Sequence, residues 1–205
     1  MMSDKAAPKA VVADPPRREQ LLGVAAELFL HNGYDSVTVE MICAKAGISG
    51  PALYRHFQGK QALLIAVVER GLRSLHEFAR ATVESELDPA TALETMVDFH
   101  IKSVMNAPPT PLIFLKNEHA FPESDRRRVR REMNLYAEEW ISTVVPLRPD
   151  LSEPEIRLLT HSVFSMLNAI ATLNKGLDHD SIVATMSHAA IQALTAIPHP
   201  DNKAP

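Results

Sequence analysis

Residues 47–60 read GISGPALYRHFQGK, and the order of residues in this stretch decides the fold of the chain. Glycine, serine, glycine and proline stand shortly before a run of aromatic and basic residues. The preceding segment predicts a short helix over 38–47, capped by Ser36 or Thr38, and Gly47 is the type of residue that commonly stops a helix. A further helix can follow Ser49, since proline in a first turn has no N–H group to satisfy there. A helix, a tight turn and a second helix predict a helix-turn-helix motif.

The same order of residues suits contact with DNA. A recognition helix presents its N-terminal residues to base edges, so small residues there let the backbone approach the major groove closely. The polar aromatic and basic groups that follow can reach phosphates, and a lysine adds its charge to the positive N-terminus of the next helix. The candidates are Ser49, Gly50, Pro51 and Ala52 near the bases, with Tyr54, Arg55, His56 and Lys60 on phosphates. The alternative is that Tyr54 and His56 are half-buried structural residues and Lys60 is a solvated charge.

The rest of the chain also reads as helical. Apolar residues recur three and four positions apart over long segments, and no alternating strand pattern stands out. Four of the seven glycines fall at positions 33, 47, 50 and 59, whereas prolines punctuate the later part. We therefore predict an all-α fold with a three-helix helix-turn-helix domain, a longer C-terminal helical domain and about nine helices in all. The predicted helices are 16–32, 38–47, 49–59, 60–86, 90–106, 111–119, 124–145, 153–175 and 179–196.

Composition narrows the classes of protein. The formal net charge is −4, the single cysteine is Cys43, and no basic segment followed by an apolar one opens the chain, so we expect a cytoplasmic protein. No uninterrupted apolar run approaches the roughly eighteen residues of a membrane span, so no membrane partner is expected. The sequence has no glycine-rich phosphate loop and no His-Glu-x-x-His motif, so we expect neither an enzyme nor a cofactor. A metal sensor stays an alternative, with ligands distant in sequence such as His100 and His119.

Short motifs between Leu21 and Gly71 carry a resemblance to a known family. They are Ala-x-x-Leu-Phe at 25–29, Gly33-Tyr34, Thr38, Ala46-Gly47-Ile48-Ser49, Leu53-Tyr54-x-His56-Phe57 and Gly59-Lys60. In combination they resemble the N-terminal DNA-binding domain of the TetR family of transcriptional regulators. The resemblance implies that Thr38, Tyr54, His56 and Lys60 contact phosphates of double-stranded DNA, that positions 50–52 lie nearest the bases, and that Arg17 and Arg18 add phosphate or minor-groove contacts. Two departures are Cys43, where the family usually has alanine, and the lack of a long side chain before Arg55 for reading guanine.

The family resemblance implies two helical domains, and the composition of residues 1–16 and 198–205 predicts a disordered segment at each end. We expect a disordered N-terminal arm (1–16), a helix-turn-helix DNA-binding domain (17–62), a helical ligand-binding and dimerisation domain (63–197) and a flexible tail (198–205). A homodimer would bind a near-palindromic operator as a repressor and be released by a small lipophilic effector. The competing hypothesis is a helical dimeric interaction module with no DNA role.

Two apolar stripes in the last long helices suit a four-helix dimer interface. The candidate dimerisation residues are Leu159, Val163, Met166, Leu167, Ile182, Met186, Ala189, Ala190 and Ala193. The alternative is that one of the two stripes is part of the core of a single chain.

An effector pocket is predicted from apolar surface with a few polar groups beside it. The candidate ligand-binding residues are Phe99, His100, Phe114, Asn117, Glu118, Phe121, Tyr136, Trp140, Phe164 and Asn168. The C-terminal part also resembles family members that control acyl catabolism and sense acyl-CoA thioesters, which makes acyl-CoA a hypothesis for the effector. The arginine-rich run 125–131 is either a solvated helix face or a site for an anionic head group.

Overall fold

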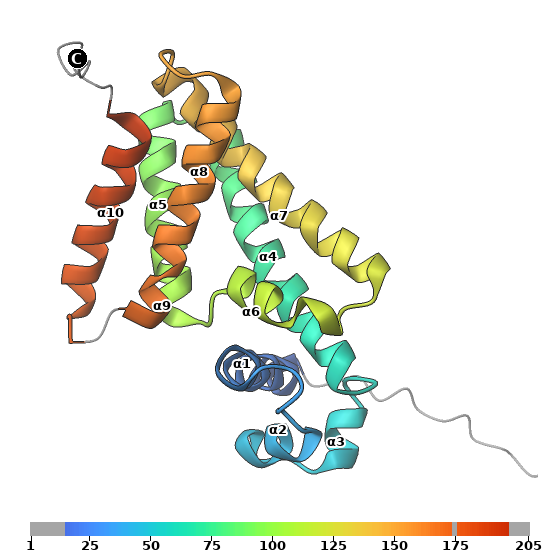
Figure 1. The fold of residues 1–205 in the computed structure, drawn as a ribbon. Helices are drawn as coiled ribbons and strands as arrows, with labels where there is room; N and C mark the ends of the chain where they lie inside the picture. Colours follow the sequence, from blue (N-terminus) through green and yellow to red (C-terminus); the bar gives the residue numbers. More distant parts are fainter. Residues whose placement is uncertain (1–14, 174–175, 197–205) are drawn as a thin grey trace, which may run out of the picture.

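The computed structural model describes residues 15–173 and 176–196, and these residues form helices and turns with no strand (Figure 1). The predicted all-α class is therefore confirmed. The helices are α1 (Pro15–Asn32), α2 (Val39–Ala46), α3 (Gly50–Tyr54), α4 (Lys60–Glu84), α5 (Pro89–Asn106), α6 (Thr110–Asn117), α7 (Glu123–Val144), α8 (Glu153–Asn168), α9 (Ile170–Leu173) and α10 (His179–Thr195), with 3-10 turns η1 (Glu118–Ala120) and η2 (Val145–Leu147). The predicted N-terminal arm and C-terminal tail lie almost wholly outside the described residues.

Local signals account for most helix ends. The Thr38 hydroxyl accepts a hydrogen bond from the Met41 backbone N–H at 3.2 Å, and Asp88 caps α5 in the same way through two backbone N–H groups. Gly47 ends α2 in the left-handed region, with a φ of 64°. Two expectations need correction. Helix α3 has only five residues, and the predicted helix 153–175 is divided at Ala169 into α8 and α9.

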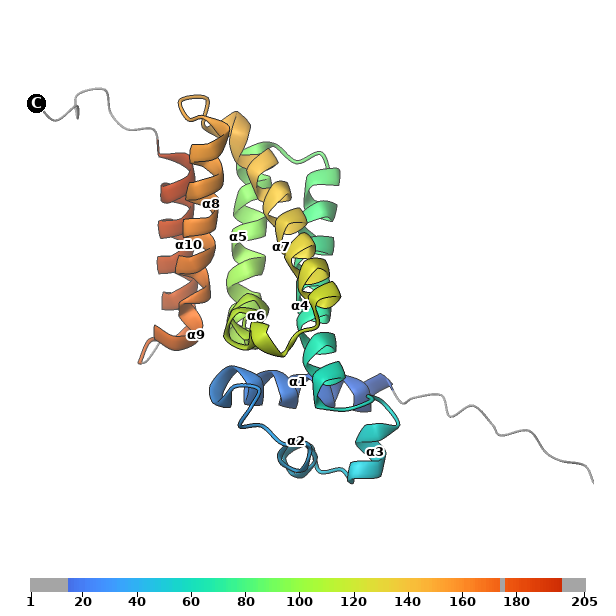
Figure 2. The ribbon, with the colours of Figure 1, turned by 45° about the vertical axis from the view of Figure 1, so that its right-hand side comes forward.

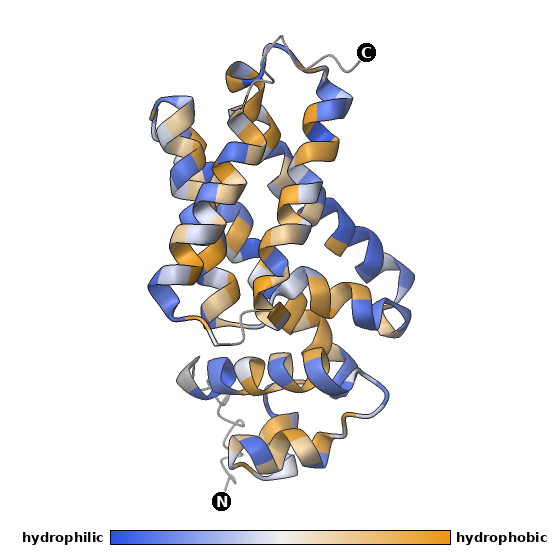
Figure 3. Ribbon diagram, turned by 60° about the vertical axis from the view of Figure 1, so that its left-hand side comes forward, coloured by the Kyte–Doolittle hydropathy of each residue, from blue (hydrophilic) through white to orange (hydrophobic). Residues whose placement is uncertain are grey.

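The helix-turn-helix lies at one end of the molecule, and the long α4 runs from it into the C-terminal bundle (Figures 1 and 2). Helix α1 crosses beneath the bundle, and α10 packs against α5 and α8 on the far side. Apolar residues gather on the sides where helices face one another, whereas hydrophilic residues follow the outer sides (Figure 3).

Buried apolar residues form two clusters. The N-terminal core joins α1–α4 to α6 and the start of α7 through residues such as Phe29, Leu53, Phe114 and Phe121. It therefore extends past residue 62, the predicted end of the DNA-binding domain. The C-terminal core joins α4, α5, α7, α8, α9 and α10, with the fully buried Trp140 among its largest members.

One segment, Glu153–Leu173, is long and apolar enough to cross a membrane by length and composition alone. It includes α8, whose Val163 and Leu167 are buried in the C-terminal core. Only 33% of its most apolar window is buried, so packing inside the bundle covers part of this apolar surface.

Candidate nucleic-acid interface and effector cavity

Core contacts fix which face of α3 points outward. Leu53 and Phe57 are buried in the N-terminal core, and the Ile48 backbone N–H donates to the Cys43 carbonyl at 3.0 Å, which holds the turn between α2 and α3. The face away from the core exposes Pro51, Tyr54 and Arg55. Tyr54 is 58% exposed, so it is not the half-buried structural residue of the alternative reading.

The remaining predicted DNA-contacting residues differ in solvent exposure. Ser49 and Thr38 are exposed, whereas Gly50, Ala52 and His56 are half-buried. The His56 Nδ1 atom has no hydrogen-bond partner among the described residues. Ser49 occupies the N-cap position of α3, yet its side chain makes no capping hydrogen bond.

Three of the basic candidates are held by neighbours. The Lys60 ammonium donates to the Tyr34 carbonyl at 2.8 Å and stands 4.0 Å from the centroid of the Tyr34 ring. The Arg18 guanidinium stands 5.1 Å from the centroid of the Phe57 ring, which makes a cation–π contact. Arg17 donates to the Gln20 side chain at 3.0 Å. These charges are therefore pre-positioned at the end of the molecule that carries α3.

Two cavities lie in the C-terminal part and share a wall. The larger, of about 590 Å³, opens between α4, α5 and the start of α6, and the smaller, of about 290 Å³, lies between α4, α5, α6, α7 and α8. Both are lined by His100 and Asn168. The smaller cavity is bounded by Leu115, Met133 and Phe164, so its interior is mostly apolar.

An aromatic cluster forms the inner wall of these cavities. The Phe164 ring stacks on His100 at 5.6 Å and on Tyr136 at 5.2 Å, and Trp140 meets Phe164 edge-on at 4.9 Å between ring centroids. The His100 Nδ1 atom and the Tyr136 hydroxyl are hydrogen-bonded at 2.8 Å. Burial lowers the pKa of His100 to about 4 and raises the pKa of Tyr136, so both side chains are uncharged at neutral pH.

Two polar side chains of this wall face each other. The His100 Nε2 and Asn168 Oδ1 atoms are buried and make no hydrogen bond of good geometry in the described part of the chain, yet the two side chains are close enough for Asn168 to act on the pKa of His100 through a hydrogen bond. The wall therefore offers polar groups beside a mostly apolar cavity.

The structure brings together six of the ten predicted ligand-binding residues and separates the other four. Phe99, His100, Tyr136, Phe164 and Asn168 line the cavities, and Trp140 lies directly behind them. Phe114 and Phe121 instead meet edge-on inside the N-terminal core, and Glu118 pairs with Arg130. Asn117 is fully buried against α1. Sequence reasoning missed Met133 and His161, although His161 stands three residues before Phe164 on the same helix.

Asn117 connects α6 to the helix-turn-helix domain. Its Oδ1 atom accepts from the Tyr34 backbone N–H at 2.6 Å, and its Nδ2 atom donates to the Ile113 carbonyl at 2.7 Å and to the Phe29 carbonyl at 3.4 Å. The neighbouring Lys116 donates to the Leu30 carbonyl at 2.5 Å. The end of α6 therefore holds the end of α1 and the turn that follows it.

The predicted dimerisation residues are divided between core and surface. Val163, Leu167, Ile182 and Ala190 are buried within the chain, whereas Leu159, Met166, Met186, Ala189 and Ala193 are half-buried. Both stripes thus contribute to the contact of α8 with α10 in the single chain. Beyond them, Leu158, Leu173 and Leu177 are 71%, 76% and 58% exposed.

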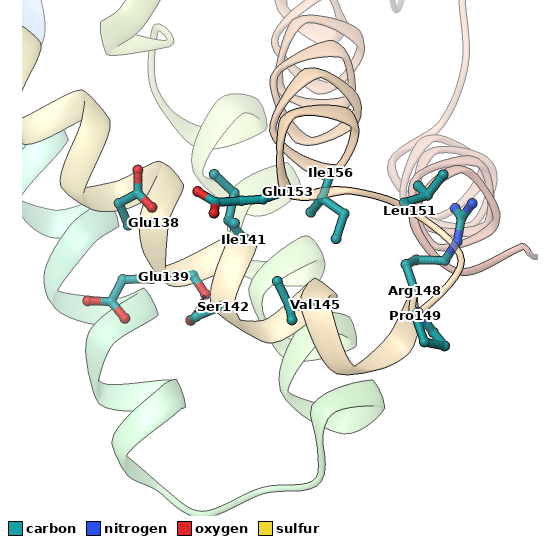
Figure 4. Close-up of a pocket in the computed structure, with 10 residues that line it drawn as sticks. All are labelled: Glu138, Glu139, Ile141, Ser142, Val145, Arg148, Pro149, Leu151, Glu153 and Ile156. Carbon is teal, nitrogen blue, oxygen red and sulfur yellow. Dashed lines mark hydrogen bonds between the residues drawn. The ribbon is translucent and has the colours of Figure 1, made fainter.

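A further hollow of about 570 Å³ lies beside the turn between α7 and α8 (Figure 4). Its charged side chains already have partners: Glu138 and Glu153 pair with Arg157, and Arg148 donates to Asp150 at 2.8 Å. The cavities at the His100 wall are therefore better candidates for a ligand site than this hollow.

Metal ligands do not cluster in residues 15–173 and 176–196, where no group of three or more His, Cys, Asp or Glu side chains is close enough to hold an ion. His100 belongs to the aromatic wall, and His119 pairs with Asp35 at 3.0 Å. Cys43 is buried in the N-terminal core.

Comparison with known proteins agrees with this geometry. Residues 21–67 match the model of the family described as bacterial regulatory proteins, tetR family. The transcriptional activator FasR of Mycolicibacterium smegmatis is 36% identical over 87 residues, which cover 40% of this chain and 40% of FasR. The chain thus matches about 40% of the length of the first curated relatives.

Solved structures resemble nearly the whole fold. A TetR-family regulator from Bordetella parapertussis is 21% identical with a TM-score of 0.79, covering 89% of this chain and 96% of that one. FadR from Bacillus subtilis in complex with stearoyl-CoA is 15% identical with a TM-score of 0.68, covering 88% and 99%. The chain therefore carries the N-terminal domain of the TetR family of bacterial regulatory proteins, joined to a helical part with the fold of solved TetR-family members.

Proposed function

We propose that this protein is a ligand-responsive transcriptional regulator that binds double-stranded DNA through α3. The observation that carries the proposal is the outward face of α3, where small residues stand beside the exposed Tyr54 and Arg55 while Leu53 and Phe57 fix the helix from behind. Small residues permit close approach to the major groove, and the polar groups reach phosphates. The long side chains needed for bidentate guanine contacts are missing before Arg55, so DNA shape and thymine methyl groups contribute to sequence reading.

The working form in this proposal is a homodimer. Leu158, Leu173 and Leu177 are large apolar side chains left in water by the single chain, and the half-buried residues of α8 and α10 adjoin them. Pairing of α8 and α10 with a second copy about a two-fold axis would cover these side chains. The two copies of α3 would then read a near-palindromic operator, with half-sites about one DNA turn apart.

The effector in this proposal is a small lipophilic molecule that binds at the His100 wall. The cavity is walled by α4 and α6, and the same two helices hold the helix-turn-helix domain through Lys60 and Asn117. A ligand that favours a second position of α4 would change the separation of the recognition helices and release DNA, as in a repressor. Acyl-CoA remains our hypothesis for the ligand, supported by the stearoyl-CoA complex of the similarly folded FadR.

The test is selection of binding sites from random DNA, followed by affinity measurement at several salt concentrations. Arg55→Ala should weaken binding and lower the slope of log affinity against log salt by about 2, because each copy of the homodimer loses one phosphate contact. The matched control is Arg80→Ala, which removes an exposed arginine from the far part of α4 and should leave affinity and slope unchanged. Recovery of no enriched sequence, or equal loss in both variants, would contradict the proposed DNA contact.

A further inference from the structure

We infer that the effector is an amphiphile with an anionic head group, which binds Arg70 at the exposed edge of the larger cavity and takes this arginine from Glu19. This inference rests on the proposed function and names the chemistry of the effector and the contact through which it acts. Its basis is an ion pair in the cavity wall. Arg70 of α4 and Glu19 of α1 pair with each other, and both line the larger cavity.

The charged residues of the larger cavity favour an anion. Among the described residues that line it, Arg70 and Lys102 are basic and only Glu19 is acidic. The contact of Arg70 with Glu19 joins the Nη1 atom to one carboxylate oxygen. A guanidinium group has five N–H donors in a planar fork that suits carboxylates and phosphates, so a ligand anion can replace Glu19. Lys102 adds a second positive charge from α5.

The arginine-rich run 125–131 is the other candidate for a head group, and its arginines are engaged elsewhere. Arg126 and Arg128 pair with acidic residues in the first turn of α7, and Arg130 pairs with Glu118. The described side chains that line the two cavities include none of these arginines. Arg70 is therefore the arginine that a ligand in the cavities meets.

The apolar part of the ligand has its place along the aromatic wall. Phe99 and His100 line the larger cavity, and His100 also lines the smaller one, where Leu115, Met133 and Phe164 supply apolar surface. A head group at Arg70 keeps its charge at the exposed edge, where it stays partly hydrated, and sends its chain past His100 into the apolar interior.

Competition for Arg70 connects the ligand to the DNA-binding domain. Glu19 belongs to α1, which crosses beneath the bundle and packs against α4 (Figure 2). A ligand anion on Arg70 leaves Glu19 without this partner and so weakens the contact between α1 and α4. Both side chains are partly exposed, so their pairing changes an equilibrium constant by about twofold to fivefold.

Trp140 provides a direct measurement of binding. It is the only tryptophan of the chain, it is fully buried, and its ring contacts Phe164 in the cavity wall. We would titrate the full chain at fixed salt with three probes that share an eight-carbon acyl chain: octanoyl-CoA, octanoate and methyl octanoate. Arg70→Gln should weaken the two anionic probes about tenfold, the loss of a hydrogen bond to a charged group, and leave methyl octanoate unchanged. The more tightly bound anion identifies the head group as phosphate or carboxylate.

Matched variants separate Arg70 from a general effect of charge. Arg73→Gln removes the same charge from an exposed position on α4 that lines neither cavity, and should leave all three affinities unchanged. Glu19→Gln should tighten octanoyl-CoA about twofold to fivefold because the competitor is gone, whereas Glu27→Gln, elsewhere on α1, should not. The gain should vanish when Glu19→Gln is combined with Arg70→Gln. Circular dichroism establishes that each variant is folded.

Operator binding tests the connection to α1. At saturating octanoyl-CoA, operator affinity should fall about twofold to fivefold less in Glu19→Gln than in the wild-type chain, because the ion pair that the ligand breaks is already absent. An equal fall in both chains would contradict coupling through this pair.

Equal weakening by Arg70→Gln and Arg73→Gln, no gain from Glu19→Gln, or no change of emission with either anionic probe would overturn this inference. DNA binding by the same preparations separates its failure from that of the proposed function. Retained operator binding in a chain that binds neither anionic probe leaves a regulator with a different ligand. Arg70-dependent binding of an anionic probe in a chain that selects no DNA would support the inference and contradict the regulator.

Discussion

The helix-turn-helix and the candidate effector cavity are built in opposite ways. The proposed DNA-contacting face comes from one stretch of consecutive residues, whose glycines and caps specify the backbone locally. The cavity wall comes from α5, α7 and α8, and its polar contact joins His100 to Tyr136, which are 36 positions apart. A local site is therefore encoded by residue order, whereas the cavity depends on how long helices pack.

The largest expected effect concerns Asn117, which joins α6 beside the cavity to the helix-turn-helix domain. Asn117→Ala should lower the free energy of unfolding by about 1–3 kcal/mol, because it leaves the part-buried Tyr34 N–H without its partner and removes the side-chain hydrogen bonds to the Phe29 and Ile113 carbonyls. Urea denaturation measures the change. Asn106→Ala is the control, since Asn106 is exposed at the end of α5 and should change stability by a few tenths of a kcal/mol at most. A similar loss in both variants would mean that Asn117 does not hold the two regions together.

Asn117 also shows where sequence reasoning reaches its limit. The all-α class, the helix-turn-helix and most helix ends were predicted because caps, glycines and helical periodicity are local signals. In the sequence, an asparagine that lines a pocket looks the same as one that joins two helices. Only the packing of the fold brings Asn117 against Tyr34, its hydrogen-bond partner 83 positions away in the sequence. For the same reason the sequence wrongly placed Phe114 and Phe121 in the cavity. One lies on α6 and the other just after η1, where an aromatic side chain can face either core, and both pack in the N-terminal core.

The pH dependence of stability should report the dry environment of the cavity wall. Burial lowers the pKa of His100 from an ordinary 6.5 to about 4. Between these values the unfolded chain binds a proton that the folded chain does not, so the free energy of unfolding decreases as the pH falls from about 7 to 4. The full shift corresponds to about 3 kcal/mol, gradually lost over that window.

Urea midpoints at pH 7, 5.5 and 4.5 check this expectation. His100→Phe should flatten the decrease relative to the wild-type chain, whereas His188→Phe, at an exposed position on α10, should keep the wild-type slope. Carboxyl groups also titrate in this pH range, and the difference between the two variants removes their contribution to the pH dependence. Parallel curves for all three proteins would show that His100 is hydrated in the folded chain.

Gly71 tests how closely α6 must approach α4 beside the cavity. A Cβ atom at this position would stand 1.9 Å from the Thr110 hydroxyl and 2.9 Å from the Thr110 Cβ atom, so Gly71→Ala forces the start of α6 away. Overpacking costs about 1–3 kcal/mol, and alanine returns up to about 1 kcal/mol of helix propensity. The expected net loss is about 1–2 kcal/mol. Gly23→Ala in α1 meets nothing within 4 Å and should instead gain stability; thermal unfolding of both variants decides whether the sign differs.

The smallest expected change in stability comes from the two N-cap positions of the helix-turn-helix. Thr38 and Ser49 both precede a helix and both read as N-cap residues in the sequence, yet only the Thr38 hydroxyl bonds to a backbone N–H group. Thr38→Ala should cost about 1 kcal/mol, and Ser49→Ala only a few tenths. If Ser49→Ala weakens DNA binding while stability is unchanged, its free hydroxyl serves the DNA interface. Equal losses of stability in the two variants would show that α3 is capped in solution by Ser49, and that local sequence controls this helix more completely than its geometry indicates.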